Sequence, residues 1–388
     1  MRSTPRPLHI CSCREFDLSG MDTADHAAET SMIGALVRSN WYDAASTLLD
    51  RTLHGELSGP RCGSETVTPN KSALLRAQQL AAAARRVLDL DAEDFASIAT
   101  GFQSPWAGRL AESSFPQQPR EPERGALGSL IPLYELMLEV LEIRAARGEP
   151  LQVVVTAHLI GEYLPLLAWE STLGHGGDPL RLPSFLGGSK WGTDDPSCAH
   201  PSASRSTAKR ALNACSGDLD GYTTYLDRFH SRLGSALAVC AVNLDTTAIG
   251  DRPEAGDMCP HPCRFVRNLP MEHRRDLDAR VRLAMLYVDS PIVALRHHAP
   301  VGHFFGVPSA AEISEAWCKT WDQLSRPWRD GCNPLTQATQ EGIPDAEELR
   351  GMSALVSAVA GRLIMAGRLL RTIGQDVVRA LLEGDEAR

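Results

Sequence analysis

Apolar residues that recur every three or four positions constrain the fold of this chain more than any other feature. Such spacing places them on one face of a helix. It extends from Ser31 to about Leu53, from Ser72 to Leu90 and from Leu127 to Arg147. Few segments alternate with period two, as half-buried strands do, and no internal repeat is found. The sequence therefore predicts an all-α fold, a large single-domain helical bundle with long irregular loops.

Proline and glycine divide the rest of the chain. We expect helices over Leu151–Leu173, kinked at Pro165, over Asp218–Thr247, over His273–Arg296 with a break at Pro291, and over Pro308–Leu324. A last helix is expected from Pro344 through Val377, because its apolar stripe includes Leu349, Leu355, Leu363 and Leu370. Segments rich in glycine and proline predict loops over 102–125, 174–206 and 248–263.

Composition sets the class of protein. An apolar fraction of 43% and a charged fraction of 22% are typical of a folded globular chain. Residues 1–20 have no periodic pattern, so we expect a disordered tail followed by one domain over 21–388.

The net charge of −9 argues against a nucleic-acid partner, which needs a concentrated basic surface. We find neither an uninterrupted apolar run of about 18 residues nor a secretion signal, and predict a cytoplasmic protein without a membrane partner.

Two thiols and an imidazole fall within five residues at Cys259, His261 and Cys263. Zinc accepts such ligands, but structural zinc sites usually add a second, similar pair. Cys198, His200 and Cys215 are the candidates for that pair, although their spacing is irregular. The alternative is that these are ordinary loop cysteines. A zinc-binding protein therefore remains a rival prediction.

Three histidines lie within seven residues at His297, His298 and His303, followed by Phe304, Phe305 and Gly306. This cluster follows an expected helix, which Pro300 and Gly302 should end. A haem site needs one imidazole on iron, a second polar group for its outer ring nitrogen, and an apolar wall against the porphyrin. The cluster offers side chains for all three.

The pattern His297…Gly302-His303-Phe304-x-Gly306 is similar to the haem-ligand region of the 3-methyltyrosine hydroxylases, in the histidine-ligated, all-helical superfamily of tryptophan and indoleamine dioxygenases. The resemblance covers about 264–306. It implies that His297 is the axial ligand, with His298 and His303 as alternatives. It further implies haem contacts from His273, Arg296, His303 and Phe304. Val301 occupies the position of a cysteine that bonds covalently to the haem, so we expect haem b without a thioether.

The same resemblance implies a haem-dependent oxygenase or hydroxylase that acts on an aromatic amino acid or an indole, in secondary metabolism, with dioxygen or peroxide as oxidant. Such a site also needs a base for the substrate and a cation for its carboxylate. The candidates are His230, Arg228 and His158. Each has a structural alternative, as surface charge or core packing. A small aromatic substrate is the expected partner, self-association into a homo-oligomer is left open, and a non-catalytic helical interaction protein is the main rival.

Overall fold

The computed structural model describes residues 21–54, 71–115, 125–182, 219–235, 237, 269–298, 306–328, 331–337 and 349–386. Within these ranges the secondary structure is almost entirely helical and contains no strand. The all-α prediction is therefore confirmed. The expected tail over 1–20 lies outside the described residues. Whereas periodicity alone led us to expect one domain over 21–388, the chain packs as two compact units, 1–85 with 373–388 and 86–372.

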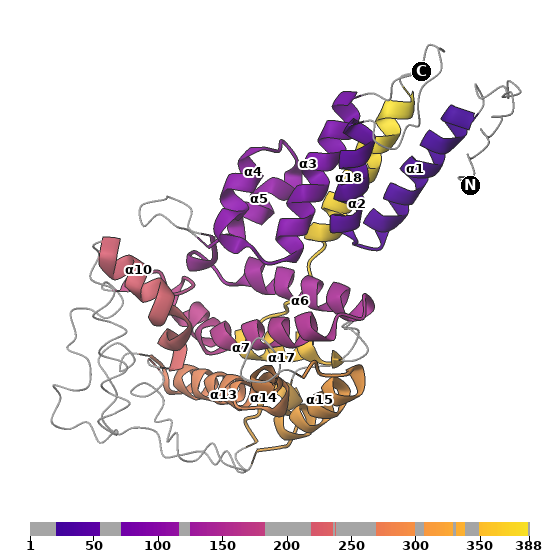
Figure 1. Ribbon diagram of the computed structural model, residues 1–388. Helices are drawn as coiled ribbons and strands as arrows, with labels where there is room; N and C mark the ends of the chain where they lie inside the picture. Colours follow the sequence, from indigo (N-terminus) through magenta and orange to yellow (C-terminus); the bar gives the residue numbers. More distant parts are fainter. Residues whose placement is uncertain are drawn as a thin grey trace, which may run out of the picture. The chain divides into compact units, whose positions relative to one another are not determined.

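The first unit contains helices α1 (Met21–Arg38) and α2 (Tyr42–His54), most of α3 (Lys71–Leu88) and most of α18 (Leu369–Glu386). These helices lie side by side in Figure 1, and Gln78 on α3 donates a 2.6 Å hydrogen bond to Asp50 on α2. Periodicity predicted one helix over 31–53, but it is broken at Asn40. The backbone of Asn40 is left-handed, with φ of 60°, and the amide of Trp41 bonds back to the carbonyl of Leu36. Asparagine tolerates that conformation better than most residues.

The second unit is built around α7 (Pro150–Leu173), which lies between α6 (Ile131–Ala146) and α13 (Met271–Val288) in Figure 1. The other elements are η1 (Ala92–Asp94), α4 (Phe95–Thr100), α5 (Pro105–Glu112), η2 (Gly125–Leu127), α10 (Leu219–Arg228), η4 (His230–Arg232), α14 (Pro291–His298), α15 (Ala310–Leu324), α16 (Pro334–Gln337) and α17 (Met352–Ala360). The helix α7 passes through Pro165. It alone among the described helices is long and apolar enough to cross a membrane. Of its most apolar stretch of 18 residues, 61% is buried.

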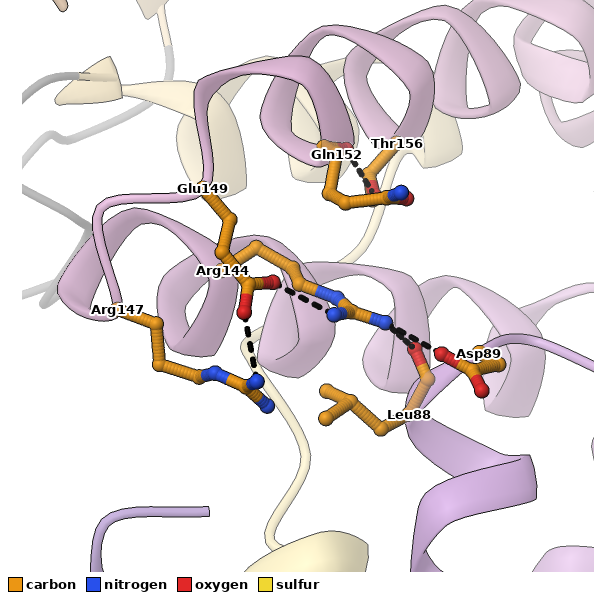
Figure 2. A network of polar contacts seen from close by, with 7 residues as sticks. All are labelled: Leu88, Asp89, Arg144, Arg147, Glu149, Gln152 and Thr156. Atoms are coloured by element: carbon orange, nitrogen blue, oxygen red, sulfur yellow. Dashed lines mark hydrogen bonds and ion pairs between the residues drawn. The ribbon is translucent and has the colours of Figure 1, made fainter. Parts of the chain in front are cut away.

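A buried arginine fixes the turn between α6 and α7 (Figure 2). Arg144 donates to Glu149 at 2.6 Å, to Asp89 at 2.7 Å and to the carbonyl of Leu88 at 3.1 Å. Arg147 pairs with the other oxygen of Glu149 at 2.6 Å. Arg144 is only 8% exposed, so its charge depends on these acceptors rather than on water. The network joins Leu88 and Asp89 to the hairpin of α6 and α7, all within the second unit.

Most expected helices are found, but besides the break at Asn40 three further predictions need correction. The helix expected over Asp218–Thr247 is broken at Phe229, between α10 and η4. The predicted loop 102–125 contains α5, because Ser104 is extended and Pro105 supplies the fixed φ of a first helical residue. The predicted helix from 344 to 377 is interrupted after α17. There Gly361 is left-handed with φ of 68°, and the hydroxyl of Ser357 bonds both the amide and the carbonyl of Ile364. Leu363, assigned to the apolar stripe, is 62% exposed as a result.

Candidate functional site

A surface depression of about 470 Å³ lies between α7 and the segment formed by α10 and η4. Its lining comprises Glu162, Asp227, Arg228, Phe229, Ser231 and Arg232. Gly234 explains how this segment approaches α7 so closely, because a methyl group there would lie 2.3 Å from the amide nitrogen of Leu166. A larger residue at 234 would therefore push the wall of the depression away from α7.

The lining carries two cationic and two acidic side chains. Arg228, Arg232 and Asp227 are exposed, and none of them forms an ion pair with another described residue. Glu162 is held in its ionised form, because a hydrogen bond from His158 and the nearby charges of Arg296 and Arg232 lower its pKa despite partial burial. Both signs of charge are therefore available to a bound molecule.

His158 lies behind Glu162 on the same face of α7. Its Nε2 is 3.2 Å from Oε1 of Glu162 and also contacts the guanidinium of Arg296 on α14. A ring nitrogen that donates to the carboxylate cannot accept from the guanidinium at the same time, so the hydrogen bond to Glu162 requires a proton on Nε2. Nδ1 of His158 is buried and has no hydrogen-bond partner.

Gly161 allows α14 to bring Arg296 to this site. A methyl group on Gly161 would lie 3.3 Å from Cε1 of Tyr287 and 3.6 Å from Cγ2 of Val293. The hydroxyl of Tyr287 also donates to the carbonyl of Ala157 at 2.8 Å, one turn away. Close packing at this glycine thus joins two sequence-predicted residues, His158 and Arg296, that are far apart in the chain.

His230, expected to act as a base, points away from the depression into the core. It is completely buried, and its Nε2 donates to the carbonyl of Gly176 at 2.8 Å. The rings of Phe115, Tyr163 and Tyr225 surround it, with centroids 5.3 to 5.4 Å away. Burial lowers the pKa of His230 to about 4. It is therefore neutral near pH 7 and does not line the depression.

His175 is a buried histidine that sequence reasoning missed. Its Nδ1 accepts hydrogen bonds from the amides of Gly177 and Asp178, at 3.1 and 2.9 Å, so its proton is on Nε2. Burial, with the charges of Arg181 and His230, lowers its pKa to about 4. The turn over Gly176 and Gly177 is tied to α10 and η4 by His230 and by Tyr225, whose hydroxyl donates to the carbonyl of Gly177 at 2.7 Å.

Of the residues assigned to haem, the structure describes the side chains of His273, Arg296 and His297. The side chains of His273 and His297 are exposed, and neither they nor Arg296 line the depression. Val301, His303 and Phe304 lie outside the described residues, as does the side chain of His298. A haem needs a buried imidazole beside an apolar wall. Residues 299–305, which would supply that wall, lie outside the described residues, so the haem assignment stays a prediction.

The rival zinc ligands Cys198, His200, Cys215, Cys259, His261 and Cys263 all lie outside the described residues. Among the residues that are described, no three histidine, cysteine, aspartate or glutamate side chains gather as a metal site would require. No family model, curated protein or solved structure matches this chain. The interpretation of the site therefore depends on its own geometry.

Sequence reasoning identified Arg228 and His158, which lie at and behind the depression, but not all of its lining. Asp227, Ser231 and Glu162 were not assigned roles as site residues. One signal was available in the sequence, a short run that combines three charged side chains with a phenylalanine, Asp227-Arg228-Phe229-His230-Ser231-Arg232.

Proposed function

We propose that the depression between α7 and α10 binds a small zwitterionic molecule that carries an aromatic ring, such as an aromatic amino acid. The observation that supports this is the lining itself, which contains two carboxylates and two arginines free of ion pairs to described residues. Guanidinium groups bind carboxylates through paired, charge-assisted hydrogen bonds. In this proposal Arg228 and Arg232 receive the ligand carboxylate.

The acidic side chains receive the ligand ammonium group. Glu162 is the stronger candidate, because its bond to His158 keeps it charged and holds it in place. Phe229 is partly buried in the same lining and offers a ring face or edge to an aromatic group. A pocket with a few placed polar groups and one aromatic wall suits a ligand of this size.

Calorimetric titration of the full chain with four related compounds tests the proposal. L-tryptophan has all three features, tryptamine lacks the carboxylate, indole-3-propionate lacks the ammonium group, and L-alanine lacks the ring. We expect L-tryptophan or L-tyrosine to bind and each truncated compound to bind roughly tenfold or more weakly, as loss of one charge-assisted contact implies.

Variants locate the binding. The double variant R228A/R232A should lose most of the affinity for L-tryptophan. R368A is the matched control, because Arg368 is exposed and lies outside the depression, and it should bind as the wild type does. No binding of any aromatic amino acid, or equal binding by the double variant, would contradict the proposal and favour the non-catalytic interaction protein.

Oxygenase activity on such a ligand stays a prediction that depends on haem. Because residues 299–305 beside His297 lie outside the described residues, the haem site stays a prediction and we assign no catalytic step. An absorption spectrum of the chain supplemented with haem tests this separately. An intense porphyrin band that shifts on reduction and addition of carbon monoxide supports the oxygenase. If the porphyrin band is absent, the proposal of an amino-acid site still holds.

A further inference from the structure

Three arginines of α13 are buried, and two of them have an aspartate one turn earlier. Arg280 contacts Asp276 at 2.6 Å and Arg282 contacts Asp278 at 2.8 Å. Both pairs have the four-residue spacing that brings side chains together on a helix. The third arginine, Arg274, is 7% exposed, but the residue four positions earlier is Pro270, which has no carboxylate.

Arg274 is left without an acceptor. Its Nε and Nη2 atoms are buried and make no hydrogen bond, and it forms no ion pair with any described residue. Arg144 shows how the same unit satisfies a buried guanidinium, with two carboxylates and a carbonyl around it (Figure 2). A buried charge without a partner is strongly unfavourable, so an unpaired guanidinium points to an anion from outside the chain.

The first turn of α13 offers further donors next to Arg274. Pro270 precedes the helix and makes no side-chain cap hydrogen bond, and the acidic residue of this turn, Glu272, is exposed to solvent. Arg274 is the fourth residue of the helix, and helical side chains generally lean toward the N-terminus, the end at which the first backbone amides lie. Backbone amides at a helix start attract anions through hydrogen bonding and the helix dipole. Met271 and His273 are exposed, so solvent reaches this turn.

We propose that Arg274 and the first turn of α13 bind an oxyanion, a phosphate or carboxylate group of a small molecule. The guanidinium fork supplies two parallel donors to two oxygens of the group, and the helix amides supply donors to the same group. None of the residues of this site lines the depression described above, so the proposal stands independently of the proposed function.

Thermal unfolding of the full chain tests the site with inorganic phosphate and acetate as probes, against sodium chloride at equal ionic strength. Phosphate stabilises many proteins by exclusion from their surface, so the readout is the difference between variants. R274M is the test variant. R275M is the matched control, because Arg275 is the exposed neighbour on the same helix and its substitution removes the same charge.

We expect phosphate, acetate or both to raise the unfolding midpoint of the wild type and of R275M with saturation, and R274M to lose that saturable part. A larger shift with phosphate identifies a phosphoryl ligand, and a larger shift with acetate identifies a carboxylate. Equal shifts in R274M and wild type overturn the proposal. The proposal is also overturned if neither probe raises the unfolding midpoint of the wild type with saturation. The partner of Arg274 would then be an acidic residue of the chain itself.

If R274M fails to fold, R274K gives the decision. Lysine keeps the charge but lacks the planar fork, so the apparent affinity for the effective probe should fall roughly tenfold, the loss of one good charge-assisted bond. Unchanged affinity in R274K overturns the proposal.

Discussion

His158 and His230 are two mostly buried histidines of the same unit with opposite surroundings. His158 contacts a carboxylate and a guanidinium beside the depression, whereas His230 is enclosed by three aromatic rings and a backbone carbonyl. The partners of His158 are the charged groups of Glu162 and Arg296, whereas burial among uncharged groups disfavours a charge on the ring of His230. The difference shows that ring chemistry is set by the partners and not by the residue type.

Replacing His230 should produce the largest effect. H230A removes a fully buried ring and leaves the carbonyl of Gly176 without its donor. We expect the free energy of unfolding to fall by about 3 kcal/mol or more. H158A, which removes a ring that is partly exposed, should cost about 1 kcal/mol. Urea unfolding of both variants measures the contrast, and equal losses would contradict it.

Lowering the pH should also destabilise the folded chain through His230. His230 has a pKa of about 4 when folded, below the ordinary value near 6.5, so the unfolded chain binds more protons between these values. Stability is then complete above about pH 6.5 and falls as the pH drops toward 4, by up to about 3 kcal/mol for His230 alone. His175 acts in the same direction.

Urea midpoints at a series of pH values measure this effect. In H230F, which keeps an aromatic ring but cannot be protonated, the part of the slope due to His230 should disappear. A slope unchanged from the wild type would show that other groups cause the acid sensitivity.

A smaller effect is expected from E162Q, which changes the carboxylate that His158 contacts. The amide keeps the shape of Glu162 but removes the charge that the hydrogen bond from His158 stabilises. Affinity for L-tryptophan should fall roughly tenfold, while stability changes by less than about 1 kcal/mol. E312Q is the control, because Glu312 belongs to a capping box at the start of α15, outside the depression. Undiminished binding by E162Q would remove Glu162 from the ligand site.

The smallest effects are expected at His273 and His297, which are exposed. Alanine at either position should change the free energy of unfolding by no more than about 0.5 kcal/mol. A loss of several kilocalories per mole in H297A would mean that this ring is packed in the folded chain, and would favour the haem interpretation. Differential scanning calorimetry of both variants is sufficient.

The helices followed from the sequence because their signals are local. The segment over Leu127–Arg147 became α6, and the boundary at Pro291 separates α13 from α14 as expected. The breaks at Asn40 and Gly361 were not foreseen. Each needs a left-handed residue whose neighbours form specific bonds, and apolar periodicity continues across both.

Only part of the candidate site could be predicted from the sequence. The four-residue spacing of His158 and Glu162 is enough to put both on one helical face, and the charged run ending at Arg232 can be read from the sequence. That Arg296 meets His158, and that His230 faces the core, depended on how closely α14 and η4 approach α7 at Gly161 and Gly234.

The sequence by itself determined the helical class, most helix boundaries and the surplus of acidic charge, because each depends on neighbours a few residues away. Tertiary structure decided which histidines are buried, which arginines have partners and where a ligand can enter. These properties depend on contacts between segments far apart in the chain, and burial or pairing changes the energy of a charged group far more than its position in a helix does.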